Sequence, residues 1–130
     1  LVISSDLQRV IDLANYTFDG LKEIKNDSRI RKCNYGDLNG KSTSLVKYEE
    51  YVNIPFPNGE SLKDVETRVQ DFCNYLLENY DNKTVAIVAH KAPQFAFEVI
   101  TQGKTWEQAI DEDWRPKKEW KPGWIYIIEN

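Results

Sequence analysis

Apolar residues along the chain fall into short continuous runs separated by longer stretches with helical spacing. Two continuous runs, Leu1–Ser4 and Thr84–Ala89, predict buried strands. The second run is apolar on both faces, which is typical of a strand in the middle of a mostly parallel sheet. A mixed run at Arg29–Lys32 predicts a further short strand, and Trp124–Ile128 predicts a final strand at or near the sheet edge.

Residues that recur in steps of three and four lie between these runs and predict helices. The clearest helix begins at Ser61, which can form a weak capping box with Asp64. Its apolar stripe consists of Leu62, Val65, Val69, Phe72, Cys73, Leu76 and Leu77. Shorter helical stretches are predicted after a cap at Ser5 or Asp6, near Leu45–Tyr51, with Pro93 in the first turn, and at Trp106–Asp111. The alternation predicts an α/β fold, a three-layer sandwich with a mostly parallel central sheet.

Composition narrows the class of protein. A length of 130 residues and a hydrophobic content of 41% fit one globular domain. The net charge of −4 argues against a nucleic-acid binder, since phosphate backbones call for a basic face. No apolar run approaches the ~18 residues of a membrane span, so no membrane association is expected. Cys33 and Cys73 lie in no CxxC motif, which indicates a reduced, cytoplasmic protein.

His90 is the leading candidate for chemistry because it is the only histidine and directly follows a predicted buried strand. Side chains at that position face the edge of a parallel sheet where ligands bind. Arg9 lies one turn into the helix after the first strand, near the same edge, where a guanidinium can hold two phosphate oxygens. The plainer alternatives are a buried histidine bonded to the backbone and a surface arginine. With a single histidine, no metal site is expected.

Other side chains are weaker candidates. Glu60 follows a Pro-Asn-Gly turn and either reaches a pocket or offsets the dipole of the next helix. Lys32 either adds positive charge to a phosphate pocket or is solvated. The aromatic residues near the C-terminus are predicted to pack in the core or at the sheet edge, with substrate stacking as the alternative: Trp106, Trp114, Trp120, Trp124 and Tyr126.

Several segments follow one another in the order of the motifs of a known family. These segments are Ser4-Ser5-Asp6-Leu7-Gln8-Arg9, Tyr35-Gly36-Asp37-Leu38-Asn39-Gly40, Pro57-Asn58-Gly59-Glu60-Ser61 with Arg68, and Ile87-Val88-Ala89-His90. They resemble the S-x-L-x-R, F/Y-G-x-W-x-G and P-x-G-E-S…R motifs and the second pocket histidine of the histidine phosphatase superfamily, phosphoglycerate mutase-like branch. The resemblance implies a phosphoglycerate mutase-like sandwich in which Arg9 and His90 bind the phosphoryl group. It also implies substrate contacts from Lys32, Tyr35, Glu60 and Lys91.

The chain departs from the family pattern at three places. The R-H-G motif, whose histidine is phosphorylated in the family, is absent and would lie upstream of Leu1. That position agrees with a chain that opens without methionine in the middle of an apolar run. Residues 1–130 are therefore expected to form a single domain that lacks its first strand. Lys32 stands where the family has a glutamate general acid, and Lys91-Ala92 replaces the usual glycines after His90.

The resemblance implies hydrolysis of phosphate monoesters of small metabolites through a phosphohistidine, without cofactor or metal. The segment between Gly40 and Gly59 is short and leaves little lid, which favours a phosphatase over a mutase. The proton for the leaving group would come from Glu60, Asp37 or the substrate. Two alternatives stay open: a catalytically impaired phosphoryl-binding or regulatory module, indicated by Lys32, and an interaction domain that uses the tryptophan-rich C-terminal region. The oligomeric state is not predicted.

Overall fold

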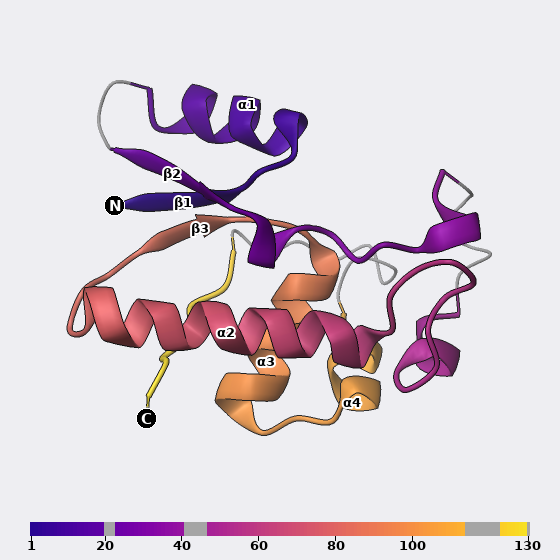
Figure 1. Cartoon of the computed structure of the whole chain (residues 1–130). Helices are drawn as coiled ribbons and strands as arrows, with labels where there is room; N and C mark the ends of the chain where they lie inside the picture. The colour runs from indigo at the N-terminus through magenta and orange to yellow at the C-terminus, as the bar shows by residue number, and fades with distance from the viewer. Residues whose placement is uncertain (20–22, 41–46, 114–122, 130) are drawn as a thin grey trace.

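A computed structural model of the chain describes residues 1–19, 23–40, 47–113 and 123–129 (Figure 1). Strands β1 (Val2–Ser5), β2 (Ile24–Asp27) and β3 (Ala86–Val88) form a parallel sheet in the order β2-β1-β3. The helices are α1 (Gln8–Thr17), α2 (Leu62–Tyr80), α3 (Lys91–Gln102) and α4 (Trp106–Asp111). Short 3₁₀ turns are η1 (Ser28–Ile30), η2 (Gly36–Leu38) and η4 (Tyr48–Tyr51).

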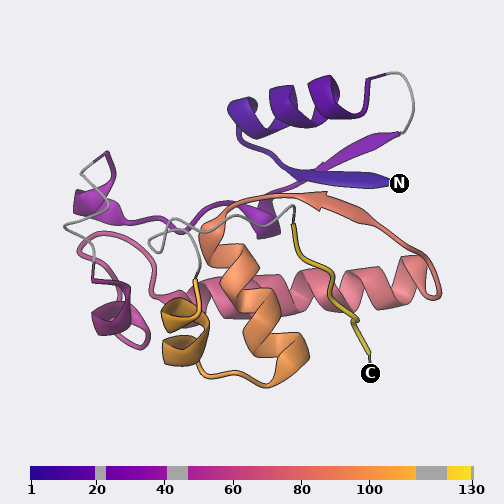
Figure 2. The ribbon, with the colours of Figure 1, turned by 180° about the vertical axis from the view of Figure 1, so that it is seen from behind.

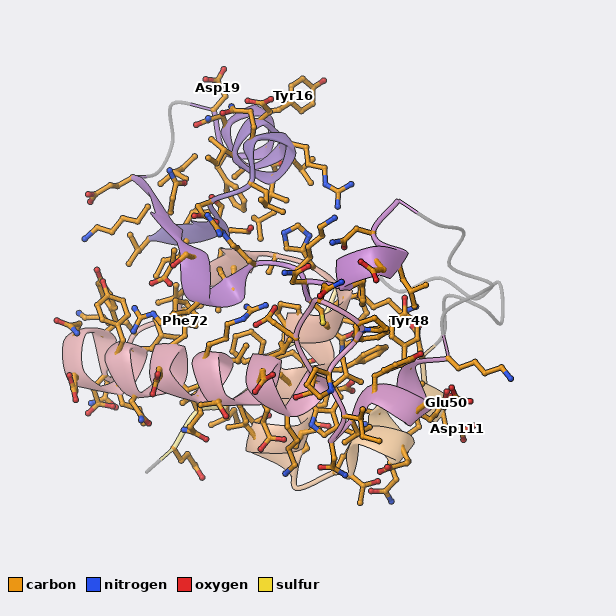
Figure 3. All side chains as sticks on the ribbon, turned by 45° about the vertical axis from the view of Figure 1, so that its right-hand side comes forward. Tyr16, Asp19, Tyr48, Glu50, Phe72 and Asp111 are labelled. Atoms are coloured by element: carbon orange, nitrogen blue, oxygen red, sulfur yellow. The ribbon has the colours of Figure 1, made fainter. Side chains whose placement is uncertain are left out.

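The elements form three layers, as the sequence predicts. Helix α1 covers one face of the sheet, while α2, α3 and α4 lie on the other (Figures 1 and 2). In Figure 3, Phe72 points from α2 toward the sheet and Tyr16 points away from it on α1. These two residues are 0% and 87% exposed respectively, and the buried cluster that contains Phe72 shows that the main core lies between the sheet and α2.

Strand β1 is the centre of the described sheet, and all four of its residues are buried. Val2 pairs with Ile24 on one side and Ala86 on the other. The buried hydroxyl of Ser4 lies 2.9 Å from Asn26 Oδ1 and donates to it, so this polar group is satisfied inside the sheet. The strand predicted at Leu1–Ser4 is thus confirmed, one residue further along.

The long helix α2 is confirmed together with its cap. Ser61 Oγ accepts from Asp64 N at 3.1 Å, and Asp64 Oδ2 accepts from Ser61 N at 2.9 Å. This reciprocal pair satisfies two backbone donors that a helix start leaves open. The predicted stripe is buried at Leu62, Val65, Val69, Phe72, Cys73 and Leu76, whereas Leu77 is half-buried.

The prediction of a strand at Arg29–Lys32 is wrong for the second strand of the sheet. That strand covers Ile24–Asp27, not Arg29–Lys32. Asp27 accepts from Arg29 N at 2.8 Å and thereby caps the 3₁₀ turn that occupies Ser28–Ile30. This local bond ends the strand before the predicted residues begin, because short polar side chains compete with ladder hydrogen bonds for backbone groups. Lys32 consequently lies in the loop after η1, not at a strand terminus.

Other boundaries also differ from the prediction. Helix α1 has Leu7 as its N-cap with no side-chain cap, although Ser5 Oγ accepts from Leu7 N at 3.3 Å. Only Tyr48–Tyr51 of the stretch predicted near Leu45–Tyr51 is described as a helical turn, since residues 45 and 46 lie outside the described residues. Residues 124–128 are extended but carry no strand assignment.

Strand β3 has an open edge. It is shorter than the predicted Thr84–Ala89, and within the described residues it pairs only with β1, so it is an outer strand there. A groove of about 1160 Å³ runs between this edge and the extended segment 123–129. Its lining includes Ala86 and Ile87 from the strand and Tyr126 and Ile128 from the segment. An apolar strand that is only half-buried on all three residues is thus left beside an apolar groove.

Candidate active site

The sheet brings His90 beside the end of its central strand. His90 is the N-cap of α3, two residues after β3, and its Nε2 lies 2.9 Å from the Oγ of Ser5. Ser5 closes β1, which is the parallel neighbour of β3, so both residues stand at the carboxyl edge of the sheet. Pro93 lies in the first turn of α3, as predicted, where its missing N–H is not needed.

The pKa of His90 is lowered to about 4, first because the ring is partly desolvated and then because cations surround it. Arg9, Lys32 and Arg68 all lower the pKa of His90, whereas Asp6 acts in the opposite direction. At neutral pH the imidazole is therefore uncharged and can donate one hydrogen bond and accept another. An anion bound among these cations would favour the imidazolium and raise the pKa again.

The cations around His90 differ in whether they have partners. Arg31 holds Asp6 in a bidentate pair at 2.6 and 2.7 Å, and Arg68 is bonded to Glu60. Arg9 and Lys32 are exposed, and among the described residues neither has an ion-pair partner. Two such cations whose charge acts on the neutral His90 form a positively charged cluster in an acidic protein, suited to a phosphate dianion.

Glu60 is held in place by Arg68. Its carboxylate accepts from Arg68 Nε at 3.0 Å, from Arg68 Nη2 at 3.1 Å and from Asn34 N at 2.9 Å. The same guanidinium also donates to three backbone carbonyl groups, those of Arg29, Arg31 and Lys32. Sequence reasoning missed this role of Arg68, although the residue was part of the motif. The pair fixes the loop that carries Lys32.

Tyr35 and Lys91 belong to an aromatic cluster beside the site. The ring of Tyr35 packs edge-on against Tyr48 and Phe56 at centroid distances of 5.9 and 5.1 Å, and burial raises the pKa of its hydroxyl. Lys91 Nζ lies 4.6 Å from the centroid of the Tyr48 ring and 3.5 Å from Asp113 Oδ2. Tyr35 and Lys91 therefore both have side-chain partners within the protein. Figure 3 labels Tyr48 at this cluster.

Two glycines, Gly36 at the start of η2 and Gly59 in the loop before α2, let these two segments lie against each other. Gly36 has φ +56°, and a Cβ there would overlap the carbonyl oxygen of Pro57. A Cβ on Gly59 would likewise overlap the carbonyl oxygen of Asn34. Backbone hydrogen bonds join the two segments, from Asp37 N to Pro57 O and from Glu60 N to Asn34 O, both 2.8 Å. The turn chemistry predicted at residues 34–40 thus positions Glu60 and Lys32 through backbone contact.

Of the described aromatic residues near the C-terminus, Trp106 and Tyr126 pack against the protein, whereas Trp124 is 37% exposed. Trp106 is buried, and its Nε1 donates to Glu66 Oε1 at 2.7 Å. The ring of Tyr126 stacks on Phe97 at 5.8 Å. Trp114 and Trp120 lie outside the described residues. The packing interpretation holds for Trp106 and Tyr126.

Within the described residues, no cluster of three or more His, Cys, Asp or Glu side chains is arranged to hold a metal ion. Among the same residues, no helix has both the length and the apolar composition that crossing a bilayer requires.

The chain is similar in sequence to two curated bacterial enzymes. The chain is 32% identical over 106 residues to a 2,3-bisphosphoglycerate-dependent phosphoglycerate mutase of Brucella melitensis, covering 72% of the chain and 51% of the mutase. It is 27% identical over 129 residues to the enzyme of the same name from Bartonella tribocorum, covering 87% and 63%. The chain therefore spans about half to two-thirds of the length of these curated relatives.

Solved structures of similar fold include two bacterial proteins. The mycobacterial glucosyl-3-phosphoglycerate phosphatase with inorganic phosphate has a TM-score of 0.69 at 22% identity, over 84% of this chain and 61% of that chain. Bacillus stearothermophilus YhfR has a TM-score of 0.71 at 19% identity, over 96% and 62%. Residues 1–109 match the family described as histidine phosphatase superfamily (branch 1). The chain belongs to the histidine phosphatase superfamily.

Proposed function

We propose that the whole protein is a phosphatase that hydrolyses phosphate monoesters of small metabolites, and that His90 and Arg9 bind the transferred phosphoryl group. The observation that carries this proposal is the neutral His90, held by Ser5 at 2.9 Å and set among the unpaired cations Arg9 and Lys32. Relatives named as phosphoglycerate mutases and neighbours named as phosphatases act on phosphorylated small molecules, which supports this substrate class.

The nucleophile would be a histidine upstream of Leu1. Its imidazole nitrogen would form a bond to phosphorus while the bond to the leaving oxygen breaks. Arg9 and His90 would donate hydrogen bonds to the equatorial oxygens, where negative charge is spread in the transition state. Water would then attack the phosphorus of the phosphohistidine and return the electron pair of the P–N bond to the imidazole. Lys32 would add charge stabilisation.

The groove along β3 supports a strand upstream of Leu1. Parallel strands lie ~4.8 Å apart, so one strand placed against the open edge of β3 would enter the groove in front of segment 123–129. It would pair with the backbone of Ala86–Val88 and cover the apolar lining. Its carboxyl end would reach the same sheet edge as His90. In this proposal, residues 1–130 are one domain that lacks its first strand.

The other predicted substrate-binding residues take different parts in this proposal. Lys32 contacts the substrate directly, because its side chain is exposed and unpaired among the described residues. Glu60 acts as a positioning residue through Arg68 and Asn34, while Tyr35 and Lys91 contribute through the aromatic cluster that Tyr48 joins beside the site. A cytoplasmic location is consistent with the free, buried thiols of Cys33 and Cys73, whose pKa values burial raises to about 12 and 11.

Lys32 also favours a second candidate function. A module that binds phosphoryl groups without turnover would need the cations and His90 but no proton donor. The two candidates are separated by p-nitrophenyl phosphate hydrolysis with the full gene product, upstream segment included. Turnover that collapses in both Arg9→Ala and His90→Ala supports the phosphatase. Folded protein that binds phosphate without turnover supports the binding module.

A matched control removes a cation elsewhere. Lys25 lies on β2, and its Nζ is 3.1 Å from the hydroxyl of Tyr80 at the far end of α2. Lys25→Ala changes the net charge as Arg9→Ala does, but away from the pocket. Its rate should stay within about twofold of wild type. An equal loss of activity in Lys25→Ala and Arg9→Ala would contradict a specific role for Arg9.

A further inference from the structure

Cations outnumber carboxylates among the charged groups that act on His90. Three cations, Arg9, Lys32 and Arg68, act on the imidazole, against one carboxylate, Asp6. Hydrolysis of an ester of an ordinary alcohol needs a group that protonates the departing oxygen, and such a group contributes about 10²–10⁴-fold to the rate. A neighbouring carboxyl group can protonate the departing oxygen only if its own hydrogen bonds and ion pairs leave it able to carry the proton.

Among the described residues, the carboxylates of Asp6, Glu60, Asp37 and Asp113 are each held by a cation or an amide. Asp6 accepts two hydrogen bonds from Arg31 at 2.6 and 2.7 Å, and this contact lowers its pKa below the usual value. Glu60 accepts from both Arg68 and Asn34. The contact with Arg31 favours the ionised form of Asp6, and donors occupy both oxygens of Glu60, so neither carboxylate is set to deliver a proton to a leaving oxygen.

The remaining two carboxylates are also engaged. Asp37 accepts from the side-chain amide of Asn58 at 3.0 and 3.2 Å. Asp113 pairs with Lys91 at 3.5 Å. Within the described residues, the groups that act on His90 and have no ion-pair partner are thus Arg9 and the ammonium group of Lys32. An ammonium group stabilises a departing oxyanion through its charge, which differs from transferring a proton to it.

We propose that the site acts on phosphoryl compounds whose leaving oxygen departs as a stable anion, such as phosphoanhydrides, acyl phosphates and aryl or enol phosphates, and that Lys32 binds that oxygen. This inference rests on the proposed hydrolytic function: it narrows the monoesters to those with a stable leaving anion, and it adds anhydrides whose leaving group is equally stable. The bond from phosphorus to the leaving oxygen breaks as the P–N bond forms, and the oxygen keeps the electron pair. No proton is transferred in that step. Water enters in the next step, which releases phosphate and restores the imidazole.

The test compares leaving groups on the full gene product. The substrates are acetyl phosphate, p-nitrophenyl phosphate, phenyl phosphate and glycerol 3-phosphate, whose leaving groups form a series of increasing basicity. We expect kcat/KM to fall steeply along this series, with glycerol 3-phosphate at least about 10²-fold below p-nitrophenyl phosphate, since the missing proton donor is worth that much. A rate for glycerol 3-phosphate within tenfold of that for p-nitrophenyl phosphate overturns the inference.

Variants of Lys32 give a second readout. Lys32→Glu places a carboxyl group beside the leaving oxygen and should reduce the ratio between p-nitrophenyl and glycerol substrates at least tenfold. Lys32→Gln removes the charge without adding a proton donor and should lower kcat/KM while the ratio stays high. The control is Lys83→Glu, an exposed lysine that precedes β3 at the opposite end of the strand from His90, which should leave the ratio unchanged. Lys32→Glu with an unchanged ratio overturns the inference.

Different results overturn the proposed hydrolysis and the narrower substrate class. Absence of turnover on every substrate, with folded protein that still binds inorganic phosphate, overturns the proposed hydrolysis and with it the narrower substrate class. Turnover that does not depend on the leaving group overturns only the narrower class. Asp113→Asn distinguishes the one buried carboxylate of the set: if Asp113 were the proton donor, this variant would steepen the dependence on the leaving group and contradict the proposal.

Discussion

Replacing Arg68 tests how the fold holds the candidate site together. Its guanidinium makes five hydrogen bonds, two to Glu60 and three to backbone carbonyl groups of the loop that carries Lys32. Arg68→Gln removes the charge and most of these bonds and leaves the Glu60 carboxylate without its counter-ion. We therefore expect a large loss of stability together with a loosened loop.

The magnitude follows from the burial of the pair. Removing one partner from a fully buried ion pair costs about 3–5 kcal/mol in the free energy of unfolding. The side chains of Arg68 and Glu60 keep exposures of 20% and 27%, so water compensates part of the loss. We expect about 2–3 kcal/mol for Arg68→Gln, or a decrease in Tm of roughly 6–12 °C for a domain of this size.

The assay is thermal and urea unfolding, with amide hydrogen exchange to locate the change. Exchange should rise most in the segment from Arg29 to Asn34, whose carbonyl groups and amide lose their partners. Arg31→Gln is the matched control, because Arg31 pairs with Asp6 at the exposed surface, where ion pairs contribute little. Equal changes in Tm for Arg68→Gln and Arg31→Gln would refute the reasoning.

Three further outcomes are expected. The folded state lowers the pKa of His90 to about 4 from its usual 6.5, so the unfolded chain binds more protons between these two pH values. The contribution of His90 to stability is therefore fully present above pH 6.5 and is lost as the pH falls toward 4. Because the ring is half-buried, we expect about 1–2 kcal/mol, measured as a pH dependence of the free energy of unfolding that His90→Gln weakens. Gly36→Ala should lower Tm more than Gly40→Ala, since both have positive φ but only Gly36 contacts Pro57, and equal effects would argue against close approach. Residues 1–130 alone should unfold at low temperature or associate, because β3 and its groove stay uncovered, whereas a cooperative melt of a monomer at an ordinary temperature would contradict the strand proposed to precede Leu1.

Elements with strong local signals were predictable from the sequence. The apolar stripe and the capping box that begins at Ser61 identify α2, and the continuous apolar runs identify β1 and β3. These signals are local, because they depend on residues that are close together in the sequence. The second strand was not predictable in the same way. Its residues Ile24–Asp27 carry one apolar side chain, so only pairing with the buried β1 makes them a strand.

The contacts of the site required the three-dimensional arrangement. His90 and Ser5 are separated by 85 residues, and their hydrogen bond follows from the parallel pairing of β1 with β3. The position of His90 after a strand was foreseeable, but the partner was not. Likewise, the sequence identifies Glu60 as a candidate, but only the folded loop shows that Arg68 and Asn34 hold it.

The most direct test of the phosphoryl pocket is a phosphate titration of the full gene product followed by NMR of the His90 ring, assigned by comparison with His90→Gln. A dianion bound between Arg9, Lys32 and His90 favours the imidazolium, so phosphate should raise the pKa of His90 from about 4 toward neutrality. The shift should be abolished in Arg9→Ala. A His90 resonance that titrates identically with and without phosphate would contradict the account.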